Sequence, residues 1–229
     1  MKKKVIVLLS GGLDSATCLY WAKARGYEPL ALLFDYGQRH RRELLSGAKV
    51  ARKAGAPFQV VKFSLPWSGS ALTDSKVKIP TGRNLKQMSR GIPATYVPAR
   101  NTVFLSFALS YADAAGAEAI VIGANAIDYS GYPDCRPEFI RSFQETANLA
   151  VKAGVEGVRF KVHAPLVELT KADIVELGTR LGVPYHLTHS CYAPTPAGLA
   201  CGGCDSCVIR RKGFEEAGVP DPTRYAAVA

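Results

Sequence analysis

Long apolar segments are missing from this chain of 229 residues, although 48% of its residues are hydrophobic. No uninterrupted apolar run approaches the roughly 20 residues that a membrane-spanning helix requires. Three lysines, Lys2 to Lys4, precede an apolar stretch as they do in a secretory signal, but the stretch "VIVLL" ends after residue 9. It is too short for the apolar region of a signal peptide. We therefore expect a cytoplasmic protein without membrane association.

Several signatures of catalysis and nucleotide binding are also absent. The chain has no Gly-x-Ser-x-Gly sequence, which marks the nucleophile of many serine hydrolases. It has neither the Gly-Lys-Ser/Thr ending of a Walker loop nor the G-x-G-x-x-G fingerprint of dinucleotide-binding folds. No internal repeat and no glutaminase domain is recognisable. These absences argue against a serine hydrolase, a Walker-type nucleotidase and a nicotinamide-dependent dehydrogenase.

Acidic residues are few compared with basic ones: 19 Asp and Glu stand against 29 Lys and Arg, a formal net charge of +10. Such a balance suits nucleic-acid binding, because Lys and Arg neutralise phosphates. A solvated basic surface, or a site that attracts anionic nucleotides, is the simpler interpretation. Aromatic residues do not alternate with the basic clusters, as they do in proteins that stack single strands. We therefore expect that nucleic acid is not required.

Apolar segments of strand length alternate with segments of helical periodicity. We expect strands at 4–9, 29–34, 58–63, 117–124 and 158–166. Helices are expected at 14–25, 38–54, 101–115, 137–153 and 171–181, with Thr170 as N-cap and Asp173 in a capping box. This alternation is typical of an α/β protein, here a Rossmann-like parallel five-stranded sheet with helices on both faces.

The chain divides into two predicted parts. Residues 1–184 would form the α/β domain, and 185–229 a small C-terminal metal-binding helical region. Residues 64–98 carry Pro, Gly, Ser and Thr with little periodicity. A segment of this kind inside a compact domain is typical of a mobile insertion or a lid.

The sequence "SGGLDS" at residues 10–15, called here the glycine loop, follows the first apolar strand. Glycines allow close backbone approach, and the following helix N-terminus favours an anion. Ser10 and Ser15 add hydroxyl donors. The loop therefore predicts a phosphate site, with a plain strand-to-helix connection as the alternative.

Four cysteines lie close together near the C-terminus: Cys191, Cys201, Cys204 and Cys207. Four thiolates at this spacing suit a tetrahedral zinc ion, one per chain, in a closed structural site. An iron–sulfur cluster is the main competitor, and a redox pair is a weaker interpretation. Cys18 and Cys135 lie apart from this group.

Five motifs together resemble one family. These are "SGGLDSAT", "DYGQRHRREL" at 35–44, "YVPARN" at 96–101, "GANAIDYSGYPDCRPEF" at 123–139 and the closing C-x9-C-x2-C-x2-C. The glycine loop resembles that of the PP-loop ATP pyrophosphatase superfamily, and the whole set resembles its 7-cyano-7-deazaguanine synthase (QueC) family. The resemblance implies an adenine nucleotide alpha hydrolase-like fold, a homodimer, and conversion of 7-carboxy-7-deazaguanine, ammonium and ATP, with Mg²⁺, into a nitrile.

The resemblance also implies site residues. Catalytic roles fall to Ser10, Asp14, Ser15, Asp128 and Lys161. Nucleotide contacts fall to Leu8, Leu9, Ser10, Gly11, Gly12, Leu13, Asp14, Ser15, Ala16, Thr17, Cys18, Asp35 and Arg100. Substrate contacts fall to Tyr129, Tyr132, Asp134 and Arg136. Lys171 is an alternative to Lys161. The alternative role of Asp35 and Asp128 is turn formation or helix capping. The alternative for residues 129–136 is a structural loop that is packed by its own aromatic side chains.

Two other functions stay open on the sequence alone. The chain could be a PP-loop enzyme that modifies tRNA directly, or a zinc-knuckle module that binds RNA. The first would require a reactive cysteine near the glycine loop or a persulfide carrier, and the second would make the glycine loop incidental.

Overall fold

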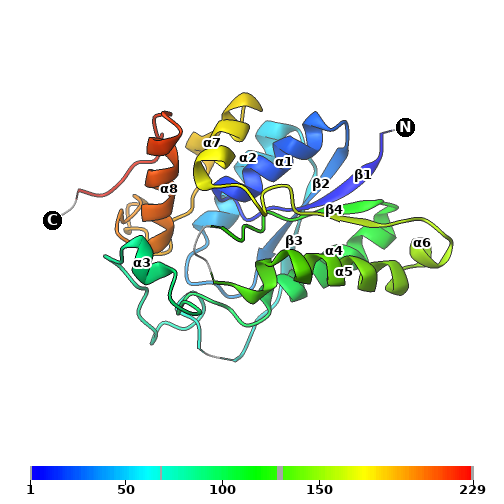
Figure 1. Cartoon of the computed structure of the whole chain (residues 1–229), viewed down its shortest axis with the longest axis horizontal. Helices are drawn as coiled ribbons and strands as arrows, with labels where there is room; N and C mark the ends of the chain where they lie inside the picture. The colour runs from blue at the N-terminus through cyan, green and yellow to red at the C-terminus, as the bar shows by residue number, and fades with distance from the viewer. Residues whose placement is uncertain (1, 68, 128–130, 228–229) are drawn as a thin grey trace.

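The protein is described by a computed structural model that covers residues 2–67, 69–127 and 131–227. Five parallel strands form one sheet in the order β3-β2-β1-β4-β5 (Figure 1). The strands are β1 (Lys4–Leu8), β2 (Glu28–Asp35), β3 (Phe58–Lys62), β4 (Ala119–Val121) and β5 (Lys161–His163). The predicted five-stranded parallel sheet is confirmed.

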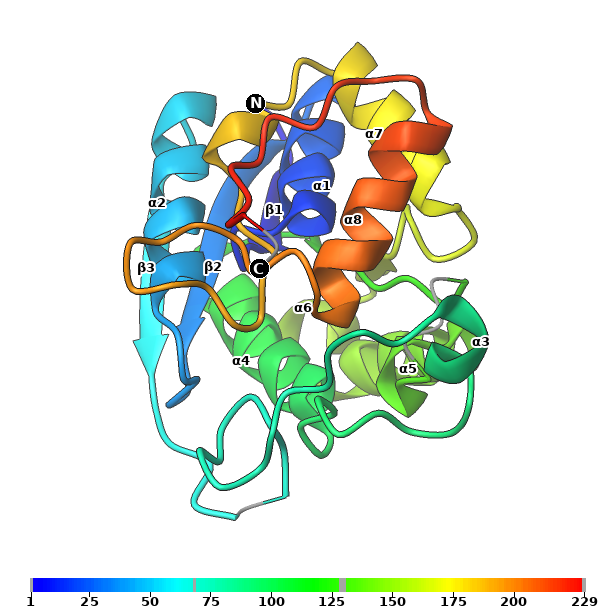
Figure 2. The ribbon, with the colours of Figure 1, turned by 90° about the vertical axis from the view of Figure 1, so that its left-hand side faces the viewer.

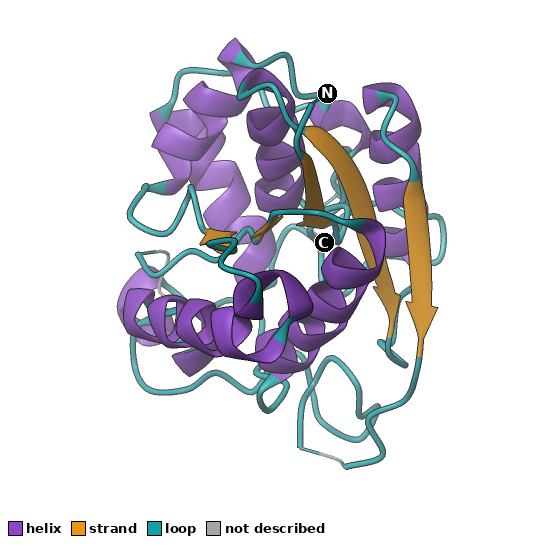
Figure 3. Cartoon of the chain, turned by 90° about the vertical axis from the view of Figure 1, so that its right-hand side faces the viewer, coloured by secondary structure: helices purple, strands orange, loops and turns teal. Residues whose placement is uncertain are grey.

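Helices cover both faces of the sheet, as predicted (Figure 3). One face packs against α1 (Leu13–Ala24), α2 (Arg42–Ala54) and α7 (Lys171–Arg180). The other packs against α4 (Arg100–Ala115) and α5 (Pro137–Ala150), which is followed by the short α6 (Lys152–Val155). The remaining helical elements are α3 (Leu85–Met88), η1 (Pro133–Cys135), η2 (Tyr185–Leu187) and α8 (Asp205–Glu216).

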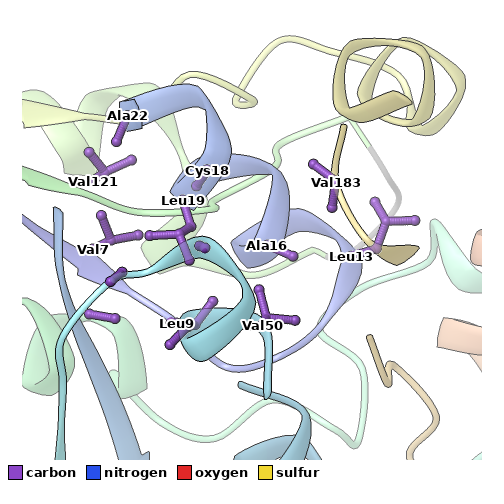
Figure 4. Packing of buried hydrophobic residues seen from close by; sticks show 14 of the residues in the cluster. Val7, Leu9, Leu13, Ala16, Cys18, Leu19, Ala22, Val50, Val121 and Val183 are labelled. Atoms are coloured by element: carbon purple, nitrogen blue, oxygen red, sulfur yellow. The ribbon is translucent and has the colours of Figure 1, made fainter. Parts of the chain in front are cut away.

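The alternation of side chains along β1 divides the core in two. Val5, Val7 and Leu9 point toward α1 and α2, whereas Ile6 and Leu8 point toward α4. A parallel sheet that is buried on both faces needs apolar residues at successive positions, and "VIVLL" supplies them. Figure 4 shows the first of these clusters, with Val7 and Leu9 packed among side chains of α1 and α2.

Helix α2 begins four residues later than the sequence predicts. Residues 36–41 instead form a turn, which the Gln38 side chain stabilises. Its amide oxygen accepts a hydrogen bond from the Tyr36 N–H at 2.8 Å, and its amide nitrogen donates to the Phe34 carbonyl at 3.0 Å. A side chain that satisfies the backbone in this way competes with helix formation.

The strands β4 and β5 are shorter than predicted. Ile122 still donates a backbone hydrogen bond to His163 at 2.9 Å, but the chain then leaves the sheet. Gly123 crosses α1 closely, because a side chain there would lie 3.2 Å from the Ser15 nitrogen. The apolar segment at 117–124 therefore serves partly as a strand and partly as the floor of the site described below.

The predicted N-terminus of α7 is confirmed. Thr170 caps the helix, and Asp173 completes a capping box: Thr170 Oγ1 accepts from the Asp173 N–H, and the Asp173 carboxylate accepts from the Thr170 N–H. Two residues beyond the helix, Gly182 has a φ of 72°. That left-handed conformation favours glycine and ends the helix there.

Residues 64–98 contact the cysteine-rich region directly. Thr81 forms an antiparallel bridge to Cys204, and the Gly82 N–H donates to the Gly203 carbonyl at 3.0 Å. Arg83 forms a two-pronged ion pair with Asp205 at the start of α8. Helix α3 accordingly lies beside the beginning of α8 in Figure 2. The role of residues 64–98 as a mobile lid stays a prediction.

The division of the chain at residue 184 also stays a prediction. Phe214 of α8 is 1% exposed and belongs to the same core cluster as β1 and α1. The cysteines form a smaller cluster of their own with Ala200. The C-terminal region thus has a separate centre but shares the main core.

Candidate functional site

The glycine loop connects β1 to α1 at the carboxyl edge of the sheet. Gly11 has a φ of 93°, and a β-carbon there would lie 2.3 Å from the Glu43 carbonyl oxygen and 2.4 Å from the Gly47 nitrogen of α2. Only glycine therefore fits at position 11 without moving α2. The loop and the first turns of α2 form one compact unit.

The two serines of the glycine loop hold its shape. Ser10 Oγ and Ser15 Oγ lie 3.0 Å apart, the Gly11 N–H donates to Ser15 Oγ at 3.2 Å, and the Gly12 N–H donates to Ser10 Oγ at 3.3 Å. Backbone amides and hydroxyls thus converge at the N-terminus of α1. This concentration of donors is typical of phosphate sites.

A cavity of about 280 Å³ opens at this edge of the sheet. Its walls come from the glycine loop, the ends of β2 and β4, the first turns of α2 and α4, and α8. The predicted site residues that line it are Leu8, Leu9, Ser10, Gly12, Leu13, Asp14, Ser15, Arg100 and Tyr132. Ligands of open α/β sheets bind at this edge.

Other predicted nucleotide contacts do not line the cavity. Ala16, Thr17 and Cys18 are fully buried in α1, where they pack in the core (Figure 4 labels Ala16 and Cys18). Thr17 Oγ1 donates to the Leu13 carbonyl at 2.9 Å and lies 3.1 Å from the Tyr185 hydroxyl. These residues fix the helix that follows the loop.

Asp35 is 8% exposed at the end of β2, with its carboxylate 3.6 Å from Arg41 and outside the cavity wall. Lys161 opens β5, so it lies at the amino edge of the sheet, away from the cavity. The structure brings Lys171, the alternative to Lys161, to the cavity instead. Its ammonium contacts both Asp14 carboxylate oxygens, at 2.7 and 2.9 Å.

Asp134 is buried and engaged with α4. Its carboxylate accepts the Asn101 N–H at 2.8 Å, and its backbone carbonyl accepts from the Asn101 side chain at 3.1 Å. It therefore caps the N-terminus of α4, which suits an acid near a helix dipole. Arg136 is exposed at the start of α5. Asp128 and Tyr129 lie outside the described residues.

Sequence reasoning missed several residues of the cavity wall. These are Tyr36, Glu43, Asn125, Ser190, Tyr192 and Arg210. Glu43 lies within the "DYGQRHRREL" motif and Tyr192 directly follows a cysteine, so both stood beside recognised features. Their spacing along the chain gives no sign that they converge, because the fold brings together the ends of different elements.

Arg100 lies among aromatic rings at the start of α4. Its Nη1 donates to the Tyr36 hydroxyl at 3.3 Å, and the guanidinium carbon lies 5.8 Å from the centre of the Phe104 ring. Its buried Nε has no hydrogen-bond partner among the residues that the structure describes. The group therefore has donor capacity left for a ligand.

The four cysteines form a compact group, called here the cysteine centre. One sulfur from each of Cys191, Cys201, Cys204 and Cys207 lies within 4.8 Å of the others. The Cys201 and Cys207 sulfurs are 4.0 Å apart, close to the separation of about 3.8 Å that metal–sulfur bonds of about 2.3 Å imply for a tetrahedron. The group could therefore hold one metal ion.

Backbone amides surround the sulfurs. The Ala193 and Cys201 N–H groups donate to Cys191 Sγ at 3.3 and 3.2 Å, and the Cys204 N–H donates to Cys201 Sγ at 3.3 Å. Hydrogen bonds from the Cys191 and Cys207 thiols and from the Tyr192 N–H lower the pKa of Cys204. Donors of this kind favour thiolates, which are the form that binds metal.

The segment before the cysteine centre contacts the glycine loop. The His189 N–H donates to the Gly11 carbonyl at 2.9 Å, and the Leu13 N–H donates to Ser190 Oγ at 3.4 Å. Arg210 of α8 donates to the Thr188 hydroxyl at 2.8 Å. The position of the glycine loop therefore depends on the fold of residues 188–210.

No helix in the described ranges is long and apolar enough to cross a membrane.

The parallel sheet, the glycine loop after its first strand and the cavity at its carboxyl edge define an α/β protein of the PP-loop class. The chain belongs to the QueC family: the sequence model of the "Queuosine biosynthesis protein QueC" matches residues 4–218. The predicted family is thereby confirmed.

Two curated relatives match over nearly their full length. The 7-cyano-7-deazaguanine synthase of Myxococcus xanthus (strain DK1622) is 60% identical, with 100% of both chains covered. That of Desulfatibacillum aliphaticivorans is 57% identical, over 98% of this chain and 97% of the relative. Among solved structures, the U34-tRNA thiolase NcsA from Methanococcus maripaludis with its [4Fe-4S] cluster is 16% identical with a TM-score of 0.49, over 95% of this chain and 73% of that one.

The cysteine centre leads to a first prediction. We expect Cys204→Ala to lower both the metal content and the free energy of unfolding, because metal binding supplies folding free energy to such sites. Elemental analysis and urea denaturation measure the two effects. Cys18→Ala, which removes a core thiol outside the centre, should change stability without changing metal content. Full metal loading of Cys204→Ala would contradict the assignment.

A second prediction concerns the ion pair between Arg210 and Asp221, whose side chains are 4% and 9% exposed and 3.1 Å apart. Asp221→Asn leaves the arginine charge buried without its partner, so we expect the free energy of unfolding at pH 7 to fall by about 3 kcal/mol. Glu216→Gln, which breaks the exposed pair with Lys212, should cost close to nothing. Urea denaturation measures both.

The loss in Asp221→Asn should also depend on pH. Burial acts to raise the pKa of Asp221, but the Arg210 charge and hydrogen bonds from Tyr225 and Thr223 outweigh it, and the pKa is lowered. A lowered folded-state pKa stabilises above the unfolded value of about 4, and the gain disappears as pH falls through the folded pKa. The difference between wild type and variant should therefore shrink in acid. A difference that stays constant would contradict this account.

Proposed function

We propose that this protein converts 7-carboxy-7-deazaguanine, ammonia and ATP into 7-cyano-7-deazaguanine, the product after which its curated relatives are named. The observation that carries the proposal is the full-length match at 60% identity to such a synthase. By the family description, the product would serve queuosine biosynthesis. The cavity supports the proposal, since it combines a phosphate-type loop with aromatic walls.

The chemistry explains the need for ATP. A carboxylate is a poor electrophile until one oxygen becomes part of a leaving group. Attack of the substrate carboxylate on the α-phosphorus of ATP forms an acyl adenylate and releases pyrophosphate. Ammonia then forms the C–N bond, AMP leaves with the oxygen, and a proton is lost to give the amide. A second adenylation, now at the amide oxygen, followed by loss of AMP and a proton, leaves the nitrile.

The glycine loop would hold the pyrophosphate end of ATP. Ser10, Ser15 and the backbone amides around Gly12 supply donors that stabilise developing charge on phosphate oxygens. Lys171 adds a positive charge at the same edge, held in place by Asp14. Mg²⁺, for which Asp128 is the proposed ligand, would neutralise phosphate charge. Arg100 would contact the nucleotide or the substrate carboxylate.

The aromatic side of the cavity suits a flat deazapurine. Tyr132 lines it, with its hydroxyl 2.9 Å from Thr95 Oγ1 and its ring 5.8 Å from that of Tyr96. Rings held in this way offer a stacking surface. Tyr129 remains proposed as a second substrate contact. Asp134 and Arg136 would act by shaping the loop that carries Tyr132, because neither lines the cavity.

The metal of the cysteine centre is proposed to be zinc, one ion per chain. Four cysteine ligands leave no open position for a catalytic water, so the ion would be structural. The main alternative is an iron–sulfur cluster. Elemental analysis should find about one zinc per chain. Iron with labile sulfide would overturn the assignment.

The direct action on tRNA and the RNA-binding role are not favoured by the family assignment. The match to the QueC model over residues 4–218 includes both the glycine loop and the cysteines, and the relatives are named as synthases of a small molecule. The charge of +10 then fits a site for anionic nucleotides. A tRNA-binding assay with tight, strongly salt-dependent capture would revive the RNA roles.

A homodimer and a cytoplasmic location complete the proposal. The family resemblance supports the dimer, and reduced cysteines that are committed to a metal are typical of the cytosol. Light scattering on the purified protein tests the homodimer. The same preparation shows whether free ammonium is a sufficient nitrogen source or a partner protein is needed.

The function leads to a third prediction, on Ser10→Ala. The variant should stay folded and metal-loaded, because Ser10 is exposed and, among the described residues, its hydroxyl hydrogen-bonds within the loop itself. Pyrophosphate release that depends on the carboxy-deazaguanine should fall by about 100-fold, as for other lost donors to developing charge. Mass spectrometry of the nitrile follows the complete reaction.

Ser106→Ala is the matched control, because Ser106 is exposed in the middle of α4 and does not line the cavity. It should behave as wild type. A wild-type protein that forms no nitrile from ATP, ammonium and the carboxy-deazaguanine would refute the proposed function.

A further inference from the structure

Glu43 places a carboxylate in the cavity wall. It takes no part in the proposed binding of phosphate by the glycine loop or in the stacking of the deazapurine on aromatic rings. It lies in the first turn of α2 and lines the cavity together with Tyr36, Arg100 and Tyr192. These groups come from four separate parts of the chain. Their convergence on one carboxylate suggests a binding function, because acidic groups are costly to bury without one.

The backbone of Glu43 is fixed against the glycine loop. A side chain on Gly11 would lie 2.3 Å from the Glu43 carbonyl oxygen, and one on Gly47 would lie 2.9 Å from Leu33 Cδ2. Two glycines thus let α2 approach both the loop and the sheet. The backbone that carries the Glu43 side chain is thereby fixed beside the glycine loop, and the side chain lines the same cavity as the loop.

The Glu43 carboxylate has no polar partner in the described part of the chain. No hydrogen bond or ion pair engages it there, and the side chain is half-buried because it faces the cavity. The charged and titratable groups that face it are Arg100 from α4, Tyr36 from the end of β2 and Tyr192 from the segment after Cys191. It is therefore an acceptor with capacity left, among hydroxyls and aromatic rings.

A small cation with hydrogen-bond donors fits these surroundings. A carboxylate oxygen and tyrosine hydroxyls accept N–H groups, and aromatic faces attract cations. Ammonium is the one reactant of the proposed reaction with these properties. Arg100 is the other cation that could pair with the Glu43 carboxylate. When an anionic substrate engages the Arg100 donors, the carboxylate is left for ammonium.

We propose that Glu43 binds ammonium and accepts its proton, so that the nitrogen attacks the adenylated substrate as ammonia. The inference rests on the proposed function and adds a catalytic residue to it. The ammonium N–H bond breaks and its proton moves to the Glu43 carboxylate. The freed lone pair forms the C–N bond, the C–O bond to AMP breaks, and AMP leaves with both electrons of that bond. The new C–NH₃⁺ nitrogen then loses its extra proton to solvent, which gives the amide.

The acidity of Glu43 agrees with this role. Burial raises the pKa of Glu43 to about 7, while the positive charge of Arg100 acts in the opposite direction. A general base works best when its pKa lies near the working pH. Since the carboxyl group is protonated at lower pH, the ammonia-dependent step should slow as pH falls below about 7.

Glu43→Gln with two nucleophiles tests the proposal, as our fourth prediction. With ammonium, nitrile formation at neutral pH should fall by about 100-fold, the usual contribution of a general base. With hydroxylamine, which is largely unprotonated at neutral pH and needs no base, hydroxamate should form from the carboxy-deazaguanine at the wild-type rate. Glu28→Gln, an exposed change at the start of β2, should leave both rates unchanged.

The outcomes separate the two proposals. Equal loss of nitrile and hydroxamate in Glu43→Gln would mean that Glu43 supports adenylation, and full retention of nitrile would mean that it has no role; either result overturns the inference alone. A wild-type protein that makes neither product would overturn the proposed function and the inference with it. If Glu43→Gln does not fold, Glu43→Asp serves instead: its nitrile rate should fall while hydroxamate formation persists, and equal loss of both would contradict the inference.

Discussion

The contact between Gly11 and α2 is the constraint on which the site depends. The absence of a side chain at Gly11 and Gly47 lets the first turns of α2 lie directly against the glycine loop, at distances that no β-carbon tolerates. The loop thereby keeps its left-handed turn, its serines can bind its own amides, and α1 begins where an anion can meet its N-terminus. The same contact carries Glu43 to the cavity.

The cysteine centre acts on this loop from the other side. His189 and Ser190 hydrogen-bond to Gly11 and Leu13, and they directly precede Cys191. A metal that orders the segment from Cys191 onward would therefore order the phosphate site, although the ion itself would take no part in the reaction. This coupling explains how a closed metal centre and an ATP site can belong to one catalytic unit, and why residues 64–98, which contact Cys204 through Thr81, are part of the same structure.

The sequence allowed the sheet and the glycine loop to be predicted, because apolar strands and "SGGLDS" are local signals. It allowed the cysteine centre to be predicted from spacing alone. The rest of the wall was missed for a physical reason: Glu43, Tyr36 and Tyr192 meet only after several elements have packed together. Lys161 and Lys171 looked equivalent in sequence, yet parallel strand direction places the first at the amino edge and the capping box of α7 places the second near Asp14.

Transfer of oxygen from substrate to AMP tests the central claim most directly, that this cavity activates the substrate by adenylation. The carboxy-deazaguanine would be labelled with ¹⁸O at both carboxylate oxygens, and AMP and pyrophosphate would be examined by mass spectrometry. The account predicts that each nitrile is accompanied by two AMP molecules, each with one ¹⁸O, and by unlabelled pyrophosphate. Label in inorganic phosphate, with ADP as the nucleotide product, would contradict it.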